Sequence, residues 1–311
     1  ALSATIDRHG DEAGTRALFN YFGEKCIEYT LEDAINNDML TPYYYHPVVV
    51  YLEDEELEEY ITLSKQIAKA IASSGVSHPN DLPSSVKMLL IKRARIVAGA
   101  HAKLNSLSAV IKPYADKSHM LVYCGSTTID DPGYVEDKPG EGEIRQIDAV
   151  SSLLGNKLHM KVAQFTSREN AEKRLLLERE FSDGKQMQVL VAIRCLDEGV
   201  NIPSIETAFI LASSTNPKEY VQRRGRVLRK APGKKYAVIY DFVTLPMDPN
   251  QIVSYPPDVV KSSKSLAVRE VIRMQDFARI SENPVESQEL INSLIEAFDI
   301  TDENKEEAPD A

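Results

Sequence analysis

The chain has 311 residues, of which 43% are hydrophobic and 27% are charged, and its formal net charge is −11. This composition is ordinary for a soluble globular protein with one or two domains. No apolar run approaches the length of a membrane helix, and the first residues lack the basic and apolar regions of a signal peptide, so we expect no membrane partner.

The acidic charge is concentrated in two segments and does not exclude nucleic acid as a partner. Residues 282–311 contain ten carboxylates and one lysine, and residues 53–59 contain six carboxylates and no basic residue. These segments carry −9 and −6, so the rest of the chain has a net charge of +4. A local basic groove is therefore compatible with an acidic chain.

Three cysteines, Cys26, Cys124 and Cys195, lie far apart and lack the spacing of metal ligands. Cys124 and Cys195 end apolar runs, which predicts buried free thiols. Free thiols predict a reducing, cytoplasmic location.

The first 46 residues are expected to form the end of one domain and an irregular connection. Tyr43–Tyr45 lies between two prolines, and could be a stacking surface or an extended linker packed on its neighbours; we favour the linker. Val48–Leu52 is predicted as a short strand from its β-branched residues. The sequence has no initial methionine and begins on a motif described below, so we expect it to be a fragment.

Helical periodicity follows in residues 47–112, which we expect to lead into a second domain. Apolar residues recur every three or four positions from Glu53 to Ser74 and again, as one long helical stretch, from Val86 to Val110. The basic residues of the second stretch are interpreted as a solvated face; they are Lys92, Arg93 and Arg95.

Residues 113–248 change to alternating strands and helices. Five apolar runs of strand length are Met120–Cys124, Lys161–Phe165, Met187–Ile193, Thr207–Ala212 and Tyr236–Val243. Helical patterns between them are Arg145–Leu154, Glu169–Phe181 and Pro217–Arg229. This alternation predicts an α/β fold in which helices cover both faces of a parallel sheet. The glycine-, proline- and acid-rich segment Asp130–Gly142 is expected to be a mobile loop.

Two helices are predicted within residues 249–300. The first spans about Asp258–Ile280, and the second has an apolar stripe from Leu290 to Phe298 that must pack on another element. Residues 301–311 are acidic and are expected to be disordered.

Three loops follow predicted strands, at the edge where open α/β sheets bind ligands. The first two, Gly125–Thr128 and Phe165–Asn170, carry small hydroxyl side chains that suit phosphate oxygens, although each alone is more typical of a helix cap. The third, Leu196–Pro203, places a carboxylate beside a glycine. It could hold a ribose hydroxyl or form a tight turn.

The segment Tyr220–Arg229 contains four arginines in ten residues. Asn216 and Pro217 just before it suit an N-cap and a first helical position. Residues Gln222, Arg226 and Arg229 are spaced i, i+4 and i+7, which predicts one shared helix face. Guanidinium groups that project together suit a phosphate group; the alternative is a solvated basic face.

The order of these motifs resembles the second RecA-like domain of superfamily 2 helicases and translocases, over about residues 118–245. Leu2–Thr5 resembles the Ser-Ala-Thr motif that closes the first RecA-like domain of those enzymes. The residue patterns of Cys195–Pro203 and Gln222–Arg229 are most similar to those of the DNA-directed group, which includes restriction-type translocase subunits and repair helicases. The His-Arg-x-Gly-Arg motif of the RNA-directed DEAD-box group is absent.

The resemblance implies a role in catalysis for Arg226 and Arg229, which match the arginine fingers that stabilise the transferring γ-phosphoryl group. Such fingers contribute on the order of 10³–10⁵ in rate. Gln222 and Arg223 match positions that bind nucleotide phosphate or connect to the neighbouring domain.

The other matching positions belong to loops. The residues expected to sense nucleotide and nucleic acid together are Glu198, Gly199 and Asn201. The residues expected to contact the nucleic-acid backbone are Gly125, Thr166 and Ser167. The residues expected to couple hydrolysis to strand movement are Ser3 and Thr5. Two positions depart from the family pattern: Asn201 replaces an aspartate, so the polar role there loses its charge, and Ile6 replaces a proline.

The sequence contains no Gly-x-x-x-x-Gly-Lys-Ser/Thr phosphate loop. Asp11–Gly14 looks like a metal-binding acidic box, but it follows the Ser-Ala-Thr motif and no apolar strand leads into it. We therefore expect the chain to be the C-terminal motor half of an ATP-dependent helicase or translocase that does not hydrolyse ATP by itself.

The resemblance implies ATP and Mg²⁺ as cofactors of the full-length protein, with Mg²⁺ ligands outside this chain. It implies DNA, a preceding RecA-like domain and restriction or repair subunits as partners. The alternative is a non-catalytic module that uses the RecA-like fold to bind nucleic acid or protein.

Overall fold

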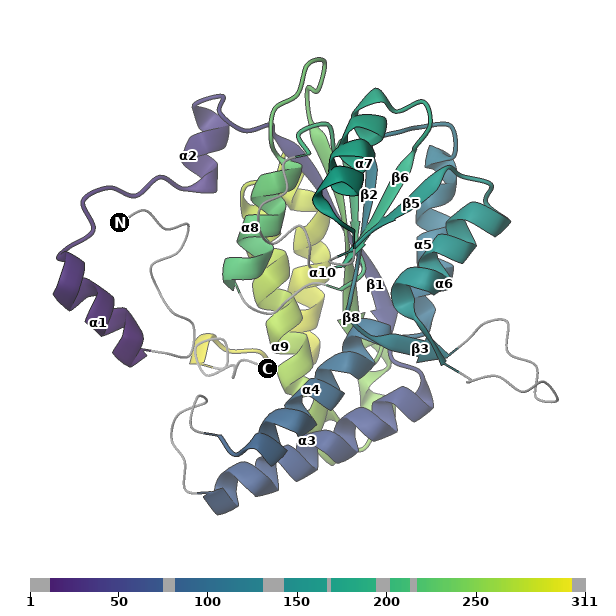
Figure 1. The fold of residues 1–311 in the computed structure, drawn as a ribbon. Coiled ribbons are helices and arrows are strands. Elements are labelled where there is room, and N and C mark those ends of the chain that lie inside the picture. Colours follow the sequence, from purple (N-terminus) through teal and green to yellow (C-terminus); the bar gives the residue numbers. More distant parts are fainter. Residues whose placement is uncertain are drawn as a thin grey trace.

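The computed structural model describes residues 12–74, 82–130, 143–166, 169–193, 202–212 and 217–303. Its centre is a sheet of six parallel strands in the order β1–β8–β7–β2–β6–β5 (Figure 1). The strands are β1 (Tyr43–Tyr51), β2 (Met120–Cys124), β5 (Val162–Phe165), β6 (Val189–Ile193), β7 (Thr207–Ile210) and β8 (Ala237–Leu245). A separate antiparallel pair consists of β3 (Thr128–Asp130) and β4 (Glu143–Arg145).

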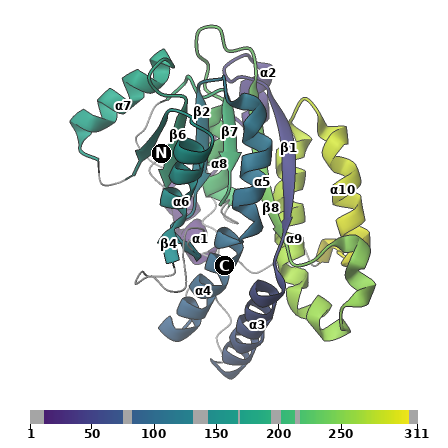
Figure 2. The ribbon, with the colours of Figure 1, turned by 90° about the vertical axis from the view of Figure 1, so that its right-hand side faces the viewer.

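Helices cover both faces of the sheet and its carboxyl edge (Figures 1 and 2). The helices are α1 (Glu12–Phe22), α2 (Leu31–Asn36), α3 (Asp54–Ser74), α4 (Ser84–Gly99), α5 (Ala102–Ile111), α6 (Gln146–Ser152), α7 (Ala171–Asp183), α8 (Pro217–Val227), α9 (Pro257–Arg279) and α10 (Pro284–Ala297). Short helical turns occupy Lys112–Tyr114, Leu153–Lys157 and Pro249–Ser254. Among the described residues, no helix is long and apolar enough to cross a membrane.

Alternation along the central strand β2 creates two cores. Leu121 and Tyr123 face one layer, together with residues of α7, α8, α9 and α10. Met120 and Val122 face the other layer, which α5 and α6 cover. All five residues of β2 are buried, because a strand in the middle of a covered parallel sheet has no solvent face. The predicted α/β fold with C-terminal helices is confirmed, as are the five strands of residues 113–248.

The tyrosine triplet is part of an edge strand, so the linker interpretation is wrong. β1 starts at Tyr43 and pairs with β8 over its whole length. Tyr43 and Tyr45 are fully buried; Tyr43 donates a hydrogen bond to the carbonyl oxygen of Phe277 (2.5 Å). Pro47 is compatible with this strand because only one side of an edge strand needs its N–H groups.

The long helical stretch from Val86 to Val110 is two helices, α4 and α5. The backbone leaves the helical region at Ala100, with φ −41° and ψ 126°. The N–H of the next residue, His101, donates to the Glu56 carboxylate of α3 (3.0 Å), in place of a bond within the helix. The break depends on a partner 45 residues away in the chain, which helical periodicity could not reveal.

The expected domain boundaries at residues 46, 112 and 248 stay a prediction. β1 belongs to the same sheet as the strands of residues 113–248. Cys124 is a buried free thiol, as expected, whereas Cys26 is exposed. Cys195, Asp130–Gly142 apart from its first residue, and residues 304–311 lie outside the described part of the chain.

Candidate nucleotide and nucleic-acid site

The arginine helix α8 lies on one face of the sheet, beside α9 (Figure 1). Tyr220 and Val227 pack into the core and fix this helix on the sheet. Gln222 and Arg226 are one turn apart and both are half-buried, as the i, i+4 spacing predicts. A guanidinium and an amide on one half-exposed face can bind phosphate oxygens.

Arg229 does not share that face, which corrects the i+7 prediction. α8 ends at Val227, and Arg229 instead forms an isolated bridge with Leu40. Thr41 strengthens this contact by donating its N–H to the carbonyl oxygen of Leu228 (2.7 Å). Because the backbone leaves the helix two residues earlier, the segment before β1 sets the direction of Arg229.

Lys234 holds the end of α8 in place, a role that no sequence pattern indicated. Its Nζ donates hydrogen bonds to the carbonyl oxygens of Val227 (2.5 Å) and Arg229 (2.9 Å). Carbonyls at a helix C-terminus lack partners within the helix, so a lysine there stabilises the end. Burial lowers the pKa of Lys234 to about 8.

The other two arginines of α8 point into the protein. Arg224 is 2% exposed; it forms an ion pair with Asp276 of α9 (2.8 Å) and lies over the Phe277 ring. Arg223 lies over the Tyr123 ring at 4.3 Å. These contacts fix α8 against β2 and α9, so half of the arginine cluster contributes to the fold.

The loop after β2 is held by a buried glutamine. Gln146, at the start of α6, accepts a hydrogen bond from the Gly125 N–H (2.7 Å) and donates to the carbonyl oxygen of Ala98 (2.7 Å). A Cβ at Gly125 would lie 3.0 Å from that of Ala212. Gly125 is therefore needed for close packing, and Ser126 next to it is exposed.

Thr166 follows β5 at the same edge of the sheet, but on the far side of β6 from Gly125. Its N–H and hydroxyl both donate to the Glu169 carboxylate, at 2.5 and 2.9 Å. The hydroxyl does not cap α7: Asn170 does, by accepting from the Lys173 N–H (2.9 Å). The helix cap expected of the loop Phe165–Asn170 is therefore present, but Asn170 provides it and the Thr166 hydroxyl does not.

Several expected site residues lie outside the described residues, and their roles stay predictions. They are Ser3, Thr5, Ser167, Glu198, Gly199 and Asn201.

A cavity of about 660 Å³ lies beside the Gly125 loop, between the carboxyl ends of β2 and β8 and the helices α4 and α9. Arg93 lines it and is 7% exposed, so the prediction of a solvated face is wrong for this residue. α3 covers Arg93, placing the Ser64 hydroxyl 3.3 Å from its guanidinium. The amphipathic pattern of α4 could not show that α3 packs on its polar side and buries Arg93.

A buried ionic network forms one wall of the cavity. Arg273 of α9 donates to Asp241 of β8 (3.0 Å) and to both oxygens of Glu270 (3.0 and 2.5 Å). Lys103 of α5 donates to the carbonyl oxygens of Val97 (2.6 Å) and Leu211 (2.7 Å). Burial lowers the pKa of Lys103 to about 8 and raises that of Glu270.

Residues 103–231 match the model of the helicase conserved C-terminal domain. The chain therefore carries a superfamily 2 helicase C-terminal domain. This match includes the Gly125 loop, Thr166 and the arginines of α8, and it confirms the predicted superfamily 2 helicase C-terminal domain.

One curated relative is the DNA 3'-5' translocase XPB2 of Sulfurisphaera tokodaii, 22% identical over 257 residues. The match covers 78% of this chain and 52% of that protein, so the chain spans about half the length of the relative. The helicase domain is thus related to a DNA translocase.

Two solved structures are also similar. The Sulfolobus solfataricus SWI2/SNF2 ATPase core in complex with dsDNA is 12% identical with a TM-score of 0.45, covering 76% of this chain and 50% of that chain. The Hef helicase domain of Pyrococcus furiosus is 17% identical with a TM-score of 0.42, covering 76% and 62%. The family assignment depends on the domain match and not on these weak similarities.

The helicase conserved C-terminal domain that residues 103–231 match belongs to a family whose members use ATP. Gln222 and Arg226, one turn apart on α8 and both half-buried, are of the residue types that bind phosphate oxygens. Among the described residues, no group of three His, Cys, Asp or Glu side chains could hold a metal ion.

Proposed function

We propose that this chain is the C-terminal motor half of an ATP-dependent DNA translocase or helicase. Arg226 and Arg229 act as fingers on the γ-phosphate of ATP, which is bound by a preceding RecA-like domain. Their cationic groups stabilise the charge of the transferring phosphoryl group, and Gln222 and Arg223 support the nucleotide side of the interface.

The observation that carries this proposal is that two arginines of α8 are fixed against the core, whereas Arg226 and Arg229 are half-buried. Arg223 and Arg224 fix the helix through Tyr123 and Asp276. Arg226 and Arg229 remain half-buried on the helix and just after its end. A helix that is held rigidly by two arginines can place the others accurately against a phosphate.

DNA is the proposed nucleic acid, because the curated relative is named as a DNA translocase. Gly125, Thr166 and Ser167 are proposed to contact its backbone, and a cytoplasmic location is proposed from the free thiols. Because the Gly125 N–H donates to Gln146, the proposed role of Gly125 is to let the DNA strand approach its loop closely, and the exposed Ser126 hydroxyl is the donor proposed for that loop.

The test compares the purified chain with a fusion to an ATP-binding domain of the same family. The chain alone should show no DNA-stimulated ATP hydrolysis, because it lacks a phosphate loop. In the fusion, Arg226→Ala should lower the turnover number about 10³-fold or more. Arg179→Ala, which removes an exposed arginine of α7, should leave turnover unchanged.

The competing function is a binding module without catalysis. Equal turnover of the fusion with and without Arg226→Ala would support the module and contradict the finger role. ATP hydrolysis by the isolated chain would contradict the proposal that the ATP-binding half lies elsewhere.

A further inference from the structure

The cavity beside the Gly125 loop is built like a site for an anion. Seven of its described lining residues are lysine or arginine and one, Glu270, is acidic. Arg273 already holds that carboxylate through two hydrogen bonds. The described lining therefore contains many more basic than acidic side chains.

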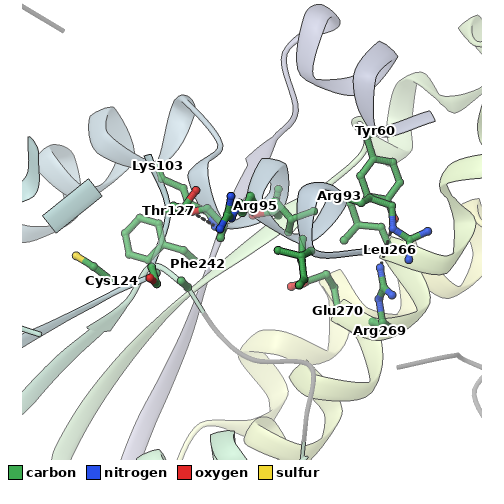
Figure 3. A pocket seen from close by; sticks show the side chains of 18 of the residues that line it. Tyr60, Arg93, Arg95, Lys103, Cys124, Thr127, Phe242, Leu266, Arg269 and Glu270 are labelled. Atoms are coloured by element: carbon green, nitrogen blue, oxygen red, sulfur yellow. Dashed lines mark hydrogen bonds between the residues drawn. The ribbon is translucent and has the colours of Figure 1, made fainter. Parts of the chain in front are cut away.

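Two buried guanidinium groups meet at one tyrosine in this cavity (Figure 3). Arg93 of α4 lies 5.5 Å from the centre of the Tyr60 ring, and Arg269 of α9 donates to the Tyr60 hydroxyl (3.3 Å). Both arginines are less than 9% exposed. Burial and the nearby charge of Arg269 lower the pKa of Arg93.

The contacts of Arg93 are with neutral groups. It donates to the Ser64 hydroxyl and lies over Tyr60, and among the described residues no carboxylate forms an ion pair with it. Burying a charge without an opposite charge is unfavourable. The nearby positive charge of Arg269 adds to the penalty for Arg93, and an anion bound beside Arg93 would offset it.

The volume and the other walls of the cavity narrow the class of anion. About 660 Å³ is within the usual range for sites that hold a small organic ligand, and is far more than one phosphate group needs. Leu90, Phe242 and Leu266 contribute apolar walls, and Ser126 contributes a hydroxyl. A charged group beside an apolar, partly aromatic space suits a nucleotide.

We propose that this cavity binds a nucleotide, with its phosphate group between Arg93 and Arg269. The nucleotide is either one unit of a bound nucleic-acid strand or a free mononucleotide. The phosphate-binding residues proposed here come from α4 and α9, whereas the γ-phosphate site proposed above uses Arg226 and Arg229, which do not line this cavity; Arg223 of α8 is a lining residue of the cavity.

The test measures binding by the whole 311-residue chain, so it does not depend on ATP hydrolysis. One probe is a fluorescein-labelled thymidine oligonucleotide, followed by anisotropy, and the other is AMP, followed by calorimetry. Arg93→Gln should weaken one of the two about tenfold or more. If Arg93→Gln weakens binding of the oligonucleotide, the ligand is a nucleotide of a nucleic-acid strand. If it weakens binding of AMP, the ligand is a free mononucleotide.

Two further variants separate binding from folding. Ala94→Glu places a carboxylate on an exposed lining position, and should weaken the same probe without disturbing the core. Lys92→Gln removes an exposed charge next in sequence to Arg93, outside the lining residues, and should change binding less than twofold. Absence of binding of both probes to the unmodified chain overturns the proposal. Unchanged binding in Ala94→Glu, or a loss in Lys92→Gln as large as that in Arg93→Gln, also overturns it.

Discussion

At the scale of single residues, the arginines of α8 have two kinds of role. Arg224 is buried and forms an ion pair with Asp276, whereas Arg226 is half-buried. The sequence predicted a phosphate-binding cluster but could not divide it. The spacing of four arginines within ten residues does not show which of them is buried. Arg224 is buried because α9 packs against it, and that packing is visible only in the tertiary structure.

Asp276→Asn should destabilise the chain, because it leaves the buried Arg224 without its opposite charge. We expect the free energy of unfolding to fall by about 3 kcal/mol, measured by urea denaturation. Asp258→Asn, on the same helix, removes an exposed pair with Lys65 and should lower it by less than about 1 kcal/mol. Equal losses in the two variants would contradict a structural role for Arg224.

Lys103 should make stability depend on pH. Its pKa is lowered from 10.5 to about 8 by burial, so between these values the unfolded chain holds a proton that the folded chain has lost. The free energy of unfolding therefore rises with pH across this window, by at most about 1.4 kcal/mol per pH unit.

Comparison with Lys103→Met isolates this contribution from other groups, such as Lys234. The variant should show a smaller rise in the free energy of unfolding between pH 8 and 10.5. The same pH dependence in both proteins would show that Lys103 keeps an ordinary pKa.

At the scale of elements, helix ends depend on contacts that the local sequence does not show. α4 ends where Glu56 accepts the His101 N–H. α8 ends at Val227, where the Lys234 side chain donates hydrogen bonds to the carbonyl oxygens of Val227 and Arg229. By contrast, α7 ends at Gly184, a left-handed C-cap of the kind that a glycine favours from the sequence alone.

Two glycines with left-handed backbones offer a matched comparison of strain and packing. Gly184 has φ +68°, and a Cβ there would lie 2.8 Å from the Ser118 Oγ; Gly233 has φ +82° and open space around it. Gly233→Ala should lower the free energy of unfolding by about 1 kcal/mol, through backbone strain alone. Gly184→Ala should lower it by about 2–3 kcal/mol, since a steric contact adds to the strain. Thermal denaturation measures both, and a larger loss at Gly233 would contradict the packing argument.

At the scale of the whole molecule, the helicase domain match does not coincide with the packed unit. The match ends at residue 231, but β8 lies between β1 and β7 in the sheet. α9 buries eleven of its residues, largely against this part of the molecule. The parts outside the match are therefore expected to be needed for folding.

A fragment of residues 103–231 should fail to unfold cooperatively in urea, because it exposes the edge of β7 and the apolar surface that α9 covers. A fragment of residues 12–303, which keeps every described element, should unfold in one transition. Circular dichroism follows both. Cooperative unfolding of the shorter fragment would show that β1, β8 and α9 are dispensable.

The sequence by itself determined the α/β class, the five strands of residues 113–248 and the order of the helicase motifs. These depend on local apolar runs and on residues near each other in the chain. The tertiary structure decided that Tyr43–Tyr51 is an edge strand, that Arg93 is buried, and that Arg229 lies beyond the end of its helix. Each of these depends on a partner far away in the chain, namely β8, α3 and Leu40, and a local pattern carries no information about such partners.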